Sequence, residues 1–66
     1  MNKDAQKLLK EAISRKIRAL QSILQWTQEA IEDDEPLEVE MKWLCAKGII
    51  SSINELIEKY IEEDEE

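Results

Sequence analysis

The 66-residue sequence has no histidine and no phenylalanine, and it contains one cysteine, one glycine and one proline. A single cysteine excludes an intramolecular disulfide, and without histidine a zinc site has almost no ligands. No run approaches the roughly 18 apolar residues that a membrane-spanning helix needs. The first ten residues, MNKDAQKLLK, contain no apolar signal region. We therefore expect a cytoplasmic protein without membrane contact, metal or cofactor.

The same absences argue against catalysis. There is no histidine, no glycine-rich phosphate loop and no cluster of metal ligands from which a common active site is built. Lys42 is three residues from Cys45 and Lys47 is two, so at most one lysine shares its helical face, and one such neighbour does not by itself indicate a reactive thiol. We predict no catalytic residues and no enzymatic activity, and we interpret Cys45 as a small, half-buried helix residue.

A chain this short buries only a modest hydrophobic core. Small proteins usually compensate with disulfides, with a bound metal or with oligomerisation. Because the composition disfavours the first two, self-association is the expected source of additional stability.

Apolar residues recur at spacings of three and four in two segments, which predicts amphipathic helices at about 4–32 and 36–62. Pro36 fits the first turn of a helix but not its interior, so a turn at 33–36 separates the two segments. Matched helices with a short connection favour an antiparallel hairpin. The predicted fold is an all-α single domain, residues 1–66, ending in a frayed acidic tail at 62–66.

The position of the turn also predicts which residues face each other, because their numbers should sum to about 69. The expected contact rows are Ala5, Leu9, Ala12, Ala19, Ile23, Trp26 and Ala30 on the first helix, and Val39, Trp43, Ala46, Ile50, Ile53, Ile57 and Tyr60 on the second. Lys16 falls among them. Either its aliphatic stem packs while its ammonium reaches solvent, or it is a polar residue that sets the register.

Further apolar residues point away from this contact, and a large exposed apolar patch usually marks an interface. The predicted oligomer interface consists of Ile13, Ile17, Leu20, Leu24, Ile31, Ile49 and Leu56. Because the symmetric pair is the commonest oligomer, we expect a homodimer in which two hairpins form a four-helix bundle. Tetramers and a complex with a different protein are the alternatives.

A second patch near the turn combines apolar and acidic residues. It contains Leu37, Met41, Leu44, Gly48, Asp33, Asp34 and Glu35. The acidic turn is either a solvated helix cap or a knob that docks on a basic partner. The sequence favours a small regulator, adaptor or inhibitor that binds an unidentified protein, of the kind met among phage or plasmid accessory proteins. A structural subunit of a larger assembly is an alternative.

Charge is divided unevenly, with a balance of +3 in residues 1–31 and −10 in residues 32–66. A polar, partly basic strip runs along the outside of the first helix, through Lys3, Lys7, Lys10, Ser14, Arg18, Gln21, Gln25 and Gln28. Such a strip could follow a phosphate backbone. The net charge of −7 opposes non-specific binding to nucleic acid.

In length and layout the whole chain resembles the plasmid-encoded Rop-type RNA-binding proteins. The resemblance implies a helical hairpin that dimerises into a four-helix bundle and presents a first-helix face to RNA. It rests on this layout and on no specific motif, and the strip lacks the aromatic residue that the Rop-type family uses on its RNA face. RNA binding is therefore the second functional hypothesis.

Overall fold

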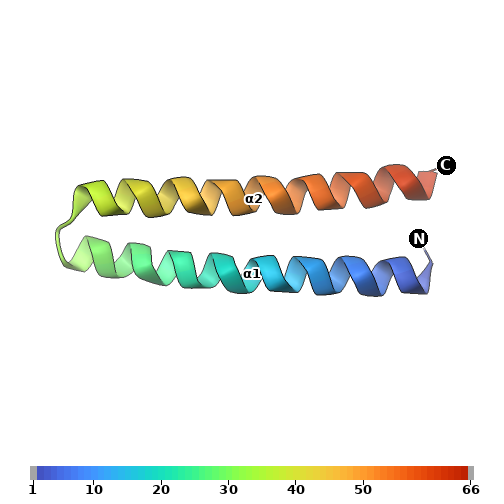
Figure 1. The fold of residues 1–66 in the computed structure, drawn as a ribbon, viewed down its shortest axis with the longest axis horizontal. Coiled ribbons are helices and arrows are strands. Elements are labelled where there is room, and N and C mark those ends of the chain that lie inside the picture. Colours follow the sequence, from blue (N-terminus) through green and yellow to red (C-terminus); the bar gives the residue numbers. More distant parts are fainter. Residues whose placement is uncertain (1, 66) are drawn as a thin grey trace.

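The computed structural model describes the backbone of residues 2–65 and the side chains of residues 2–62. Two helices, α1 (Lys3–Glu32) and α2 (Pro36–Glu65), lie antiparallel, with both chain ends at the same end of the molecule (Figure 1). No strand occurs among the described residues. The predicted all-α, two-helix hairpin is confirmed. The predicted tail at 62–66 is helical through Glu65, and Glu66 lies outside the described residues.

Side-chain and dipole effects explain where α1 begins. The side-chain oxygen of Asn2 accepts a hydrogen bond of 2.7 Å from the backbone N–H of Ala5. This bond satisfies one of the four N–H groups that a helix start leaves without an intrahelical partner. Asp4 adds a negative charge in the first turn, where the helix dipole favours it.

The end of α1 is a Schellman motif. The N–H of Glu35 donates to the carbonyl of Ala30 at 3.0 Å, and the N–H of Asp34 donates to the carbonyl of Ile31 at 3.1 Å. This pattern requires a residue with left-handed backbone angles after the helix, and Asp34 has a φ of 55°. The turn therefore holds a non-glycine residue in a conformation that glycine adopts at lower cost.

Substitution of Asp34 by glycine is expected to raise the free energy of unfolding by about 0.5–1 kcal/mol, because glycine has no Cβ to resist the left-handed conformation. The control is Asp33→Gly, which removes the same charge at a φ of −84°. In that variant, relief of backbone strain should add nothing to the free energy of unfolding. Urea denaturation followed by circular dichroism, at equal chain concentration, measures both. Equal shifts in the two variants would contradict the prediction.

Helix α2 starts directly after this motif. The N–H of Val39 donates to the carbonyl of Glu35 at 3.0 Å, so Glu35 occupies the position before the first helical residue. Pro36 follows at the first helical position, where its fixed φ suits the helix and its missing N–H costs no hydrogen bond. The two helices are thus joined by only three residues, 33–35.

The hairpin is a single layer. The Cα atoms extend over 49 × 16 × 8 Å, and the radius of gyration is 15.3 Å. A compact domain of this length would have a radius of gyration of about 11 Å. Only Ala30 and Ala46 are buried, at 7% and 0% exposure, among the described residues. One layer of two helices leaves most other side chains with at least one side open to solvent.

We call the residues between the two helices the hairpin core. Half-buried or buried residues line it at Leu9, Ile13, Lys16, Leu20, Ile23, Thr27 and Ala30 on α1, and at Val39, Lys42, Ala46, Ile49, Ile53, Leu56 and Tyr60 on α2. Nine of the fourteen predicted contact residues are half-buried or buried, including Ala5 and Ala12 near the start of α1. The prediction is wrong at the other five, because at each of these positions the neighbouring residue in the sequence enters the core instead. Five residues predicted to lie in the core are consequently exposed: Ala19, Trp26, Trp43, Ile50 and Ile57.

The displacement has a steric reason. Small residues such as Ala46 let the two backbones approach closely, and an indole ring is too large for that space. Trp26 lies at the edge instead, where the ammonium of Lys42 stands 5.3 Å from the ring centroid. The stem of Lys42 is half-buried while its charge reaches this ring. Lys16 is half-buried in the same core.

Candidate interaction surfaces

One broad side of the hairpin carries two apolar rows. Ile17, Leu24 and Ile31 are seven residues apart on α1, so they share one side of that helix. On α2 the corresponding row follows Pro36 at the same spacing, through Trp43, Ile50 and Ile57. A shallow depression next to the turn is lined by Ile31, Pro36 and Val39 together. The two rows therefore lie on the same side of the hairpin.

We call the surface formed by Ile17, Leu24, Ile31, Trp43, Ile50 and Ile57 the open face. These six side chains are between 38% and 60% exposed. The opposite side carries different residues near the turn, since Trp26 lines a separate depression with Glu38 and Lys42. The open face is thus a one-sided, nearly continuous apolar surface that extends along both helices.

The predicted oligomer interface is divided between two places. Ile17, Leu24 and Ile31 belong to the open face. The remaining members are half-buried and line the hairpin core: Ile13, Leu20, Ile49 and Leu56. The α2 half of the open face was missed because its residues had been assigned to the core. Spacing alone could not have found it, because the core residues Ile49 and Leu56 are also seven residues apart.

A second apolar surface lies on α2 alone. We call Leu37, Met41, Leu44 and Gly48 the outer stripe, and their spacing of four and three residues places them on one side of the helix. Leu37 is 70% exposed, Met41 52% and Leu44 58%. The acidic residues predicted to accompany them, Asp33, Asp34 and Glu35, are also exposed. Asp33 and Glu35 line a depression with Lys42, and Asp34 lines another with Ile31, so the acidic residues surround the turn and the apolar stripe runs along α2 from it.

Gly48 faces open space within the chain. A Cβ atom built at this position would meet no atom within 4 Å. Gly48→Ala is therefore expected to raise the free energy of unfolding by about 0.5–1 kcal/mol, because alanine loses less backbone entropy in a helix. Thermal denaturation measures the change, with Ser51→Gly as a control that should lower stability. A destabilised Gly48→Ala variant would show that the position is occupied by something outside the hairpin.

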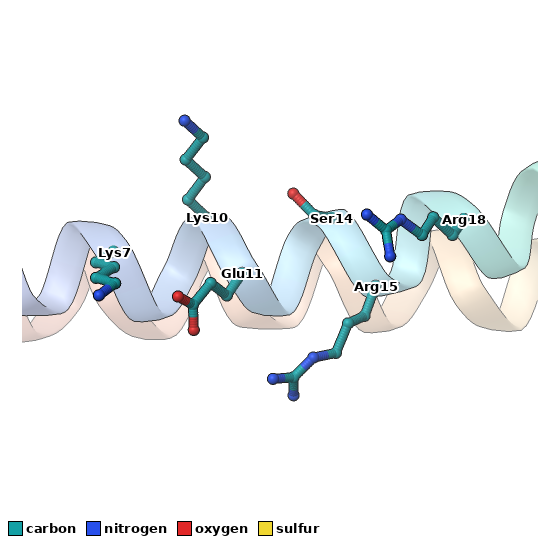
Figure 2. Close-up of a pocket in the computed structure, with 6 residues that line it drawn as sticks. All are labelled: Lys7, Lys10, Glu11, Ser14, Arg15 and Arg18. Atoms are coloured by element: carbon teal, nitrogen blue, oxygen red, sulfur yellow. The ribbon is translucent and has the colours of Figure 1, made fainter.

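The polar strip on α1 is exposed along its whole predicted length, at Lys3, Lys7, Lys10, Ser14, Arg18, Gln21 and Gln25. Part of it lines a shallow depression with Glu11 and Arg15, neither of which was in the predicted set. Figure 2 shows Lys10 and Arg15 extending to opposite sides of the helix, with Glu11 between Lys7 and Arg15. The depression therefore contains a carboxylate, which lowers the positive potential of this part of the strip.

Comparison of the chain with protein families, with characterised proteins and with solved structures finds no match. The functional argument therefore rests on these surfaces.

Two further predicted features can be placed. Cys45 is exposed and free, so the prediction that it is half-buried is wrong. It lies one residue from Ala46, on the edge of α2 rather than in the hairpin core.

Within the described residues, no group of cysteine, aspartate or glutamate side chains is arranged to hold a metal ion. In the same part of the chain, neither helix has an apolar stretch long enough to cross a membrane.

Proposed function

We propose that this protein is a non-enzymatic helical hairpin that self-associates through its open face and acts by binding another protein. The open face carries the proposal, because six large apolar side chains on one side of a hairpin form a surface that usually becomes an interface. A second copy is the simplest occupant. It would supply an equally long apolar surface, and a two-fold arrangement would turn two layers into a four-helix bundle.

The exposed area supports a partner of this size. The chain exposes 5418 Å² of surface. A compact monomer of 7.7 kDa would expose about 4300 Å². The excess of about 1100 Å² exceeds the ~800 Å² that each partner buries in a standard interface. Covering the open face would therefore bring the protein to the surface area of an ordinary compact domain.

Sedimentation equilibrium of the purified chain tests self-association directly. We expect a mass of two chains at micromolar concentration. The mass should not fall to that of one chain under conditions where circular dichroism shows that the helices remain folded. A helical protein that keeps the mass of one chain even at high concentration would overturn the self-association part of the proposal.

RNA binding through α1 is a second proposal, and the depression lined by Lys7, Lys10, Ser14, Arg15 and Arg18 favours it. Four basic groups and one hydroxyl suit a run of phosphates. Glu11 within the depression and the net charge of −7 oppose it. For this reason we rank it below protein binding.

Salt dependence separates the two functions. If RNA binds the strip, log Kd should vary with log salt concentration with a slope of magnitude about 3, as expected for four phosphate contacts. The double substitution Lys10→Gln with Arg18→Gln should reduce that slope by about half. Lys47→Gln with Lys59→Gln removes the same charge from α2 and should have little effect. No binding of RNA at low salt would exclude this function.

A further inference from the structure

We infer that the outer stripe of α2 is a docking site for an amphipathic helix of another protein whose apolar side is flanked by lysine and arginine. This inference rests on the proposed protein-binding function and names the chemistry of the partner.

The outer stripe has the dimensions of a helix–helix contact. Leu37 and Gly48 are eleven residues apart, so the stripe is about 16 Å long, or three turns. Its three large side chains are more exposed, on average, than those of the open face. A Cβ atom added at Gly48, the end of the stripe, would meet no atom within 4 Å, which leaves room for another backbone to approach. Side chains at this spacing fit the apolar stripe of a partner helix.

The stripe is separate from the open face. Met41 and Trp43 are two residues apart, as are Gly48 and Ile50. Residues two apart in an α-helix differ by about 200° around its axis. A second copy seated on the open face would therefore leave the outer stripe uncovered. Leu37 and Leu44 lie about 100° from the row of Trp43, so self-association and partner docking use different sides of α2.

Charge around the stripe determines the kind of helix that fits. Residues 19–58 contain nine acidic side chains and only two basic ones, Lys42 and Lys47. Both lysines stand over tryptophan rings, Lys42 over Trp26 at 5.3 Å and Lys47 over Trp43 at 5.5 Å. Neither tryptophan belongs to the stripe.

Carboxylates outnumber basic groups around the stripe, although Lys47 borders it beside Gly48 and Lys42 lines a depression with Asp33 and Glu35. Asp33, Asp34 and Glu35 are exposed at its turn end, Glu40 lies beside Met41, and Glu55 follows Gly48 by seven residues. An apolar centre with an acidic rim is complementary to an apolar stripe with a basic rim. An acidic or neutral helix would have to bring its own charges against these carboxylates or leave them unpaired.

The test uses the full chain and two designed peptides, each about four helical turns long. Both peptides carry leucine at spacings of four and three; one has lysine and arginine beside the leucines, and the other has glutamate there. Fluorescence anisotropy of each labelled peptide measures binding. The basic peptide should bind the chain, the acidic one should not, and added salt should weaken the complex.

Two variants locate the binding surface. Met41→Ser with Leu44→Ser should weaken binding of the basic peptide at least about tenfold, because two apolar anchors are lost. Gly48→Gln should weaken it comparably while leaving the helices at least as stable, since glutamine is a better helix former than glycine. Circular dichroism and sedimentation equilibrium should show that both variants keep their fold and mass.

Several results would overturn the inference. The inference fails if both variants bind the basic peptide as tightly as the unmodified chain does. It also fails if the unmodified chain binds the acidic peptide as tightly as the basic one, or binds neither. A reduced mass of the outer-stripe variants would also overturn it, because the stripe would then belong to the contact between copies. A monomeric chain that still binds the basic peptide would refute self-association alone. A dimer that binds neither peptide would refute this inference alone.

Discussion

Replacement of Ile17 and Ile50 together by glutamate is expected to convert the self-associated protein into monomers. Ile17 is 43% exposed and begins the α1 row of the open face, and Ile50 is 47% exposed and is the middle member of the α2 row. In a two-fold dimer each substitution occurs twice, so four carboxylates would enter one apolar interface. No member of the open face is basic; the nearest basic side chain placed against it is Lys47, whose ammonium stands 5.5 Å from the Trp43 ring centroid and could pair with one of the two carboxylates of each chain.

The effect should be large. Burying an unpaired charge costs several kcal/mol even after the surroundings adjust. A total of about 4 kcal/mol corresponds to roughly a thousandfold loss of association. Sedimentation equilibrium should then give the mass of one chain at concentrations where the unmodified protein gives two.

The control places the same two charges on other sides of the helices. Gln25→Glu and Ser51→Glu are both at exposed positions outside the open face, and this double variant should keep the mass of the unmodified protein. If the control dissociates as well, net charge rather than the open face governs association. If neither variant dissociates, the open face is not the interface.

Substitution of Ala46 by leucine is expected to lower the free energy of unfolding by about 1–3 kcal/mol, because the larger side chain has no free space in the hairpin core. Ala46 is 0% exposed, the lowest value among the described residues. Leucine is a good helix former, so the loss would come from the tertiary contact and not from local helix propensity. With so small a core, a loss of this size is a substantial fraction of the total stability.

The matched control is Ser51→Leu, which adds the same side chain at an exposed position of the same helix. It should be neutral or slightly stabilising. Urea unfolding must be compared at equal chain concentration, because the stability of an oligomer depends on it. An Ala46→Leu variant as stable as the control would mean that the two helices do not pack at this position.

Local signals in the sequence determined the two helices and the turn. The apolar spacing, the position of Pro36 and the acidic residues before it each act within one or two helical turns, so they can be interpreted without a tertiary structure. The structure places α1 at Lys3–Glu32 and α2 at Pro36–Glu65, close to the predicted bounds. The left-handed Asp34 was not predicted, because most helices that end in this way have glycine or asparagine at that position.

The tertiary structure alone decided which neighbouring row of each helix enters the hairpin core. On α2, the row of Ile49 and Leu56 and the row of Ile50 and Ile57 are equally apolar, and they differ by only one residue. Hydrophobicity cannot separate them, because one residue is a rotation of about 100° and a wide apolar side contains both.

Packing against the other helix decides which of the two rows enters the hairpin core. Small residues such as Ala46 allow close approach of the backbones, and the two tryptophans are displaced to the edges, where lysine ammoniums cover their rings. That one-residue choice moves Trp43, Ile50 and Ile57 out of the core. It creates the α2 half of the open face, which the periodicity of the sequence could not distinguish from the core.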